Sequence, residues 1–170
     1  LYVELNKFDE AQSFFRKALK IDDNIIETNY NLATLLQSIG KIKEAKEFYN
    51  KILQINENFT RADFGLSMLE KYDTSNSHIK KMENKINKEL HKTGYKDLYF
   101  ALGKVYEDIN DCDKAFIFLK KGNELKKEIT NYSVENDKNL FEKIISFHDK
   151  NQSIKDLSGK DSKKIIFILG

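Results

Sequence analysis

Residues 40–55 read Gly40-Lys-Ile-Lys-Glu-Ala-Lys-Glu-Phe-Tyr-Asn-Lys-Ile-Leu-Gln-Ile55, and the segment 34 residues earlier has the same pattern. Small and apolar side chains recur at matching positions of the two copies: Ala11 and Ala45, Phe15 and Tyr49, Ala18 and Ile52, Leu19 and Leu53. A third copy contains Ala115, which follows Ala45 by 70 residues, or two periods and a two-residue insertion. Repetition at such a period predicts an array of similar units rather than one globular core.

The copies also share a turn residue in front of their apolar stripe, which is Asn6, Gly40 or Asn110. Glycine and asparagine most readily adopt a positive φ, which a tight turn between antiparallel helices requires. The apolar positions that follow are spaced i, i+4, i+7 and i+8, so they lie on one face of a helix. The second helices of the three copies are expected over residues 8–20, 42–54 and 113–126.

A 34-residue period with two helices per unit is the mark of the tetratricopeptide repeat, and the chain is identified by it as a member of that family. The expected fold class is all-α, a solenoid of helical hairpins with about seven or eight helices in total. The solenoid would occupy residues 1–128, with a partial first repeat and a degenerate repeat at about 60–93.

In the degenerate repeat we expect a first helix near residues 62–72, a polar break at 73–77, and then a lysine-rich helix, with Gly94 ending the segment before the next repeat. The buried side of the lysine-rich helix would carry Ile79, Met82, Ile86 and Leu90. His78 and His91 have no partners at metal-ligand spacing, so we expect both at the surface and no metal site.

Composition predicts a protein without a strong electrostatic preference. The 29 basic and 27 acidic residues are interleaved and leave a net charge of +2, so neither nucleic acid nor membrane is expected as a partner. Apolar runs reach only about five residues, too few to span a bilayer. The lone Cys112 excludes an internal disulfide and is expected to be a buried, inert thiol. The chain starts at Leu1, so its N-terminus is expected to be missing; a cytoplasmic location is expected.

After the repeats the pattern changes three times. A capping or connecting helix is expected within residues 129–150, followed by a linker over 151–163. Residues 164–170 then form a non-alternating apolar run closed by Gly170, which is typical of a parallel strand buried on both faces. Such a strand predicts the start of a truncated α/β domain. The alternative is a short tail that docks on the last helix.

Two segments resemble a known protein family. Phe100-Ala-Leu-Gly-Lys-Val-Tyr-Glu-Asp108, followed by Asp113-Lys-Ala-Phe-Ile-Phe-Leu-Lys-Lys-Gly-Asn123, is similar to the last repeat of bacterial proteins that join tetratricopeptide repeats to a sulfotransferase domain. In that family a strand like residues 165–170 leads into a loop of the type Met-Pro-Arg-Ser-Gly-Thr. The loop binds the sulfate donor through backbone amides and a helix N-terminus.

The resemblance implies that the parent protein transfers a sulfuryl group from 3′-phosphoadenosine 5′-phosphosulfate to a hydroxyl acceptor such as a protein tyrosine. Only Gly170 would belong to the cofactor loop, and no catalytic residue can be carried over, so this chain would be a non-catalytic interaction region. Two alternatives remain: a stand-alone repeat adaptor that binds peptides or proteins, and a repeat region fused to another nucleotide-binding enzyme.

The family's usual binding surface is the concave face of the first helices, and its ligand there would be a peptide, a protein or the parent's own catalytic domain. The corresponding positions in this sequence are Glu27, Tyr30, Thr34, Gln37, Arg61, Phe64, Met68, Lys71, Asp97, Phe100, Lys104 and Glu107. We expect Tyr30, Phe64 and Phe100 to supply aromatic anchors, because buried aromatic side chains dominate interface energetics. The lysine and asparagine set that chaperone-binding members use is not present at these positions.

Overall fold

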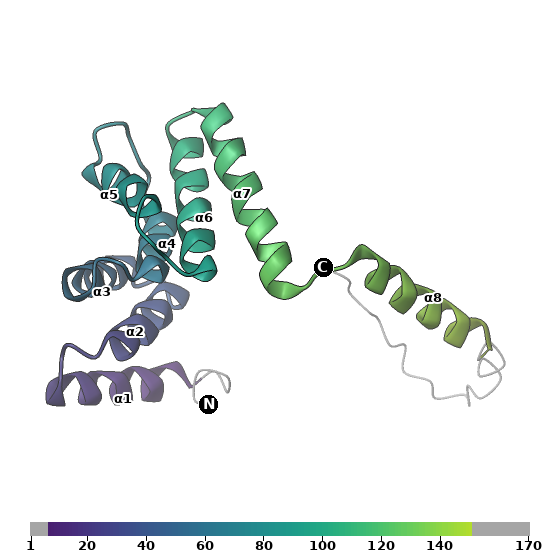
Figure 1. Ribbon diagram of the computed structural model, residues 1–170. Coiled ribbons are helices and arrows are strands. Elements are labelled where there is room, and N and C mark those ends of the chain that lie inside the picture. The colour runs from purple at the N-terminus through teal and green to yellow at the C-terminus, as the bar shows by residue number, and fades with distance from the viewer. Residues whose placement is uncertain (1–6, 151–170) are drawn as a thin grey trace. The chain divides into compact units, whose positions relative to one another are not determined.

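The computed structural model describes residues 7–150 (Figure 1), and this part of the chain is all-helical, as predicted. Its eight helices are α1 (Phe8–Ile21), α2 (Ile26–Ser38), α3 (Ile42–Ile55), α4 (Thr60–Leu69), α5 (Ser77–Ile86), α6 (Lys92–Asp108), α7 (Cys112–Thr130) and α8 (Val134–Lys150). The predicted linker at 151–163 and strand at 164–170 lie outside the described residues. No described helix is long and apolar enough to cross a membrane.

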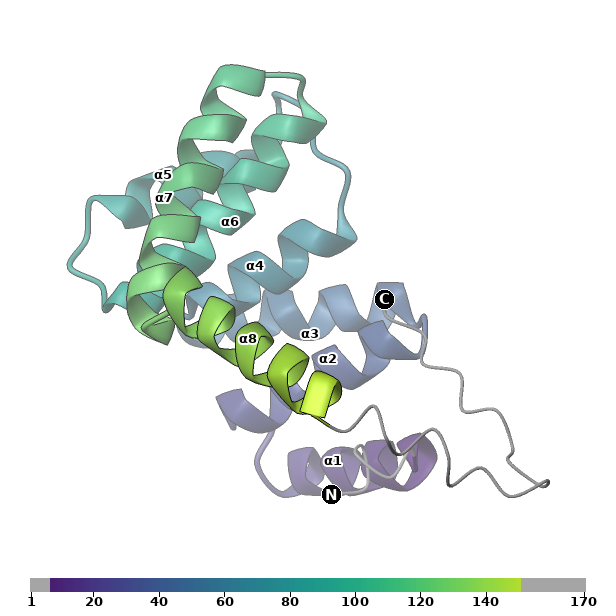
Figure 2. The ribbon, with the colours of Figure 1, turned by 90° about the vertical axis from the view of Figure 1, so that its right-hand side faces the viewer.

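The chain divides into two compact units, of which the first ends at Thr130 and the second begins at Asn131. In the first unit, α2 packs on α3 and α6 packs on α7 as helical hairpins, while α4 packs on both α3 and α6. Figure 2 shows this unit from α1 at the bottom to α6 and α7 at the top. The second unit contains α8, whose apolar side chains are mostly exposed. Its predicted role as a cap of the repeats stays a prediction.

The turns inside the two complete hairpins confirm the sequence argument. Gly40, between α2 and α3, has a φ of 77°, and Asn110, between α6 and α7, has a φ of 60°. The equivalent Asn6 precedes the described residues. Both turns are closed by backbone hydrogen bonds that use the last carbonyl groups of the first helix, including Lys41 N to Leu36 O at 2.8 Å and Asp111 N to Tyr106 O at 2.9 Å. These left-handed residues therefore fix the antiparallel direction of the second helices.

The helices of a pair approach closely at small residues. Ala11, Ala45 and Ala115 are all buried, as the repeat pattern predicts for the positions where two helices meet. Cys112 is exposed, so the prediction of a buried thiol is wrong. The physical reason is its position: Cys112 is the first residue of α7, and burial in that helix begins only at Ala115.

The contact between α3 and α4 is tighter than the sequence pattern reveals. The ring of Tyr49, on α3, lies directly on the backbone of Gly65, on α4, and a Cβ atom added to Gly65 would be 2.4 Å from Tyr49 Cζ. Tyr49 is almost completely buried there. Only glycine leaves room for the aromatic ring, so this pair sets the distance between the second and third repeats.

The third repeat departs from the regular hairpin. Its first helix, α4, ends at Leu69. The chain then runs through the buried Tyr72 to α5, and no residue between the two helices has the positive φ of Gly40 or Asn110. The lysine-rich helix packs chiefly on α6, through Ile79 and Met82, and its backbone stays further from α4 than the two helices of the neighbouring repeats do. Gly94 does not end this segment as predicted, because it lies inside the first turn of α6.

A buried polar cluster joins α5 to α4. Asp63, on α4, is completely buried, and both of its carboxylate oxygens lie 2.7 Å from the ammonium nitrogen of Lys85. His78 Nε2 lies 2.9 Å from Asp63 Oδ1, and its Nδ1 lies 2.8 Å from the Tyr72 hydroxyl. The prediction of a surface position is therefore wrong for His78, which is buried and bonded to the carboxylate of Asp63. His91 is exposed, as predicted, and caps the start of α6.

The tight Tyr49–Gly65 contact predicts a large effect of a single added methyl group. We expect Gly65→Ala to lower the free energy of unfolding by about 1–3 kcal/mol, because a rigid ring cannot move aside in a close-packed core. Gly94→Ala is the matched control, since its Cβ would meet neighbours only at 3.4 Å or more, and it should be neutral or slightly stabilising. Urea unfolding of both variants measures this; equal midpoints for the two would contradict the packing argument.

Candidate binding surface on the first helices

The twelve residues predicted to line a binding surface lie on the first helices of three successive repeats. The structure places four of them on α2, three on α4 and four on α6, while Lys71 lies two residues beyond the end of α4. They do not form one uniform strip. Some make accessible clusters between neighbouring helices, and others are engaged in contacts that hold the repeats together.

The first accessible cluster joins α2 to α4 and is centred on Arg61. Its guanidinium carbon lies 4.6 Å from the ring centroid of Tyr30 and 4.6 Å from that of Phe59. The two rings contact each other edge to face, with centroids 5.6 Å apart. The carboxylate of Glu27, one turn before Tyr30, forms an ion pair with Arg61. We call Glu27, Tyr30, Phe59 and Arg61 the arginine–aromatic cluster.

The sequence predicted Glu27, Tyr30 and Arg61 but not Phe59, which immediately precedes α4. Cation–π contacts of this type contribute roughly 0.5–1 kcal/mol at exposed sites and more when a ligand removes water from them. Arg61 and Glu27 both keep a large part of their side chains exposed, so the cluster can be covered further. It therefore combines a flat aromatic surface with a charged edge.

The other two predicted residues of α2 are used locally. Thr34 Oγ1 donates a hydrogen bond to the Tyr30 carbonyl at 2.5 Å, within its own helix. Gln37 Oε1 accepts a hydrogen bond from the Tyr49 hydroxyl at 3.0 Å, which ties α2 to α3. Thr34 is exposed and open to a ligand, whereas Gln37 is half-buried and serves the packing of Tyr49.

A second accessible feature is a pocket between α4, α6 and the end of α7. The rings of Phe64 and Phe100 both line it, with centroids 6.5 Å apart and ring planes tilted by 60°. The pocket has a volume of about 290 Å³ and is lined by Phe64, Lys96, Asp97, Phe100, Lys126, Ile129 and Thr130. We call it the Phe64–Phe100 pocket. It is apolar inside and carries two ammonium groups from different helices.

The sequence missed Ile129 and Thr130 as pocket residues because it placed the end of the last repeat helix at residue 126, and it missed Lys126 because the predicted surface took in the first helices alone. The helix α7 continues to Thr130 and thereby forms one wall of the pocket. Phe100 is held in place by the same helix: a Cβ atom added to Gly122 would lie only 3.2 Å from the Phe100 ring.

Two predicted binding residues, Asp97 and Lys104, also make contacts that hold the repeats together. Asp97 is buried, pairs with Lys96 at 2.9 Å and accepts a hydrogen bond from Thr60 at 3.4 Å. Lys104 donates to the Glu70 carbonyl and to the Asp108 carboxylate, so its ammonium group closes the end of α4. The remaining predicted residues, Met68, Lys71 and Glu107, are exposed. Gly170 lies outside the described residues.

Burial changes the acidity of the tyrosines next to this surface. It raises the pKa of Tyr30, and the positive charge of Arg61 opposes that rise. Burial also raises the pKa of Tyr49 to about 12. Both hydroxyls therefore stay neutral at physiological pH, and the arginine–aromatic cluster keeps its net charge. Within residues 7–150 no group of three or more metal-ligating side chains comes together.

Antiparallel helix pairs that stack along one direction, with aromatic and charged side chains on the first helices, define a helical-repeat protein. Two family models, both of the tetratricopeptide repeat, match residues 2–63 and 96–129, which together make up more than half of the chain. The chain therefore belongs to the tetratricopeptide-repeat family. The stretch between the two matches contains most of the third repeat, in which α5 stands away from α4.

Comparison with solved structures supports the same fold. A structure described as "Crystal structure of MamA" is 21% identical, with a TM-score of 0.57, over 77% of this chain and 75% of that chain. A second, "Crystal structure of MamA protein", is 20% identical, with a TM-score of 0.55, over 78% and 72% of the two chains. At this level of identity the likeness concerns the fold alone. No curated protein sequence matches the chain.

The pKa of Tyr49 gives a test of how tightly α2, α3 and α4 enclose its hydroxyl. The absorbance difference between the wild-type protein and Tyr49→Phe should titrate with a midpoint near pH 12 rather than near pH 10, the value of an exposed tyrosine. Because the pKa is higher in the folded state, the neutral hydroxyl contributes stability that is fully present below about pH 10 and is lost as the pH rises towards 12. A midpoint near 10 in the folded protein would contradict the burial.

Proposed function

We propose that the chain is an interaction scaffold that binds an extended peptide segment of a partner protein along the first helices. The observation that carries this proposal is the spacing of two accessible features on successive helices. The arginine–aromatic cluster lies between α2 and α4, and the Phe64–Phe100 pocket lies between α4 and α6. An extended chain that follows the stack would contact both in turn.

The chemistry of the pocket indicates which side chains it accepts. Its interior is formed by Phe64, Phe100 and Ile129, so an apolar side chain of the peptide would be buried there. The ammonium group of Lys126 has no ion-pair partner within the described part of the chain and stands at the edge of the same pocket. An acidic residue next to the apolar one would pair with it. The preferred ligand is therefore a peptide with an apolar anchor flanked by a carboxylate.

The arginine–aromatic cluster would add affinity of a different kind. Arginine and tyrosine are the side chains most often found among residues that dominate binding energy, because they offer large contact areas and several hydrogen bonds. Covering Arg61 with a peptide would remove water from its stacking contacts and strengthen them. The free edge of the guanidinium would then hydrogen-bond to peptide carbonyl groups.

The sulfotransferase interpretation stays a prediction. It depends on the apolar run at residues 164–170 and on Gly170, which lie outside the described residues, and the family models match the repeats only. 3′-Phosphoadenosine 5′-phosphosulfate as cofactor, and the parent's catalytic domain as the partner of the repeats, depend on the same interpretation. The codons that follow residue 170 decide it directly, because a Met-Pro-Arg-Ser-Gly-Thr-like loop would have to begin there.

The peptide-binding proposal can be tested by changing one wall of the pocket. Peptides selected from a random library on the wild-type protein would be synthesised and their affinities measured by fluorescence anisotropy. Ile129→Ser should weaken binding about ten-fold, because it removes apolar contact from the anchor site. Ile117→Ser is the matched control, since Ile117 is exposed on the same helix but does not line the pocket.

Two results would contradict the proposal. One is an equal loss of affinity in Ile129→Ser and Ile117→Ser. The other is a library that yields only peptides without an apolar residue next to an acidic one, since such peptides would not use the pocket and Lys126 together.

A further inference from the structure

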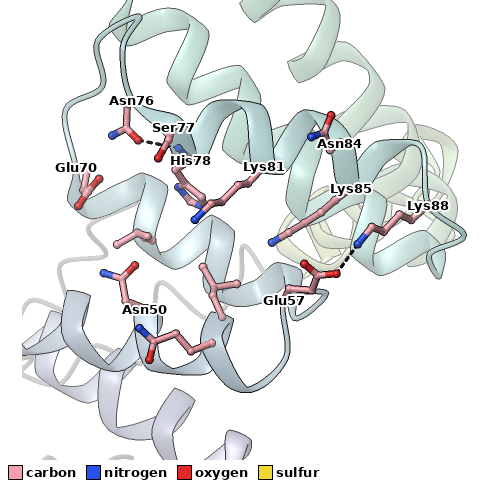
Figure 3. Close-up of a pocket in the computed structure, with 13 residues that line it drawn as sticks. Asn50, Glu57, Glu70, Asn76, Ser77, His78, Lys81, Asn84, Lys85 and Lys88 are labelled. Atoms are coloured by element: carbon pink, nitrogen blue, oxygen red, sulfur yellow. Dashed lines mark hydrogen bonds and ion pairs between the residues drawn. The ribbon is translucent and has the colours of Figure 1, made fainter.

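The departure of α5 from the regular hairpin leaves a cleft on the side of the molecule that the second helices form. The cleft has a volume of about 580 Å³. The helix α3 contributes Asn50 and Gln54 to its lining, and α5 contributes Lys81 and Asn84. Figure 3 shows Asn50 on α3 and Lys81 and Asn84 on α5. In a regular repeat α5 would instead pack on α4, as α3 packs on α2. This cleft is separate from the proposed peptide-binding surface, whose residues lie on the first helices.

Two charged or titratable side chains in the wall are fixed by the buried polar cluster. Lys85 is 5% exposed and His78 is 9% exposed, and both line the cleft while their polar atoms bind Asp63 beneath it. Because Asp63 uses both of its oxygens for Lys85 and one also for His78, it holds α5 at a defined distance from α4. The cleft is therefore built into the third repeat by specific bonds rather than by loose packing.

Among the charged groups that line this cleft, the ammonium group of Lys81 has no ion-pair partner in the described part of the chain. The other charged side chains that line the cleft are paired: Lys85 with Asp63, Lys88 with Glu57 at 2.6 Å, and Glu70 with Lys46 at 3.2 Å. The side chain of Lys81 makes no ion pair or hydrogen bond with any described residue, and Figure 3 shows it reaching from α5 into the space that faces α3. One positive charge is thus left over in a partly enclosed site, where a counter-charge is favoured.

The amide groups around Lys81 are also available. The side chains of Asn50, Gln54 and Asn84 line the cleft and make no side-chain hydrogen bond within residues 7–150. Each amide offers two donors and one acceptor, so a ligand with hydroxyl or amide groups can be bound from both walls. The volume falls in the range of small-molecule sites.

We propose that this cleft binds a small organic acid that carries hydroxyl or amide groups besides its carboxylate. The carboxylate pairs with the ammonium group of Lys81, and the polar groups of the acid bond to Asn50 and Gln54 on α3 and to Asn84 on α5. Bound in this way, the acid bridges two helices that the protein itself leaves apart. Binding therefore stabilises the third repeat by an amount that rises with the logarithm of the acid concentration once this exceeds the dissociation constant.

The test uses the full chain, isotope-labelled, with three acids as probes: glucuronate, citrate and N-acetylglutamate. Glucose serves as the neutral counterpart of glucuronate. We expect at least one acid to shift the backbone amide signals of residues 50–57 and 76–88 in a saturable way, while glucose leaves them unchanged. Lys81→Gln should weaken that acid's binding about ten-fold, because a hydrogen bond to a charged group is lost.

Lys80→Gln is the matched control, since it removes the same charge from the neighbouring position of α5, which does not line the cleft. It should leave the affinity unchanged. The proposal is overturned if none of the three acids shifts these signals, or if glucose shifts them as glucuronate does. It is also overturned if Lys80→Gln and Lys81→Gln weaken binding equally. Lys80 and Lys81 are both exposed, so neither substitution is expected to unfold the protein.

Discussion

The buried carboxylate of Asp63 is the constraint on which the irregular third repeat depends. A charged group without contact to water costs several kcal/mol unless it is paired and fully hydrogen-bonded. The partners of Asp63 are both on α5, and they are 15 and 22 residues away along the chain. The helix α5 must therefore stay within reach of Asp63. Because the Lys85 side chain is long, its ammonium group reaches Asp63 although the backbone of α5 does not pack on α4.

This arrangement has consequences on two sides of the molecule. On the side of the second helices, the gap between α3 and α5 becomes a polar cleft with a free ammonium group. On the side of the first helices, α4 remains in the stack, because Tyr49 packs on Gly65 and α4 also packs on α6. The arginine–aromatic cluster and the Phe64–Phe100 pocket thus stay on neighbouring first helices, although the hairpin in the middle of the stack is open.

The repeated features of the structure could be predicted from sequence because they are local. The period of 34 residues, the apolar stripes of the second helices and the left-handed turn residues Gly40 and Asn110 are each visible in a short window. The burial of His78 could not be read in this way, because nothing near it in the sequence marks Asp63 as its partner. Helical spacing likewise could not show that Asp97, which lines the Phe64–Phe100 pocket, is bonded to Thr60 and Lys96.

The polar cluster around Asp63, rather than close packing on α4, fixes the position of α5 relative to α4. Hydrogen exchange of Lys85→Met, with Lys80→Met as control, tests it most directly. Removing one partner of a buried ion pair costs about 3–5 kcal/mol, so the amides of residues 77–86 should lose protection in Lys85→Met while those of residues 26–55 keep theirs. Unchanged protection of residues 77–86, or an equal loss in both regions, would contradict the claim.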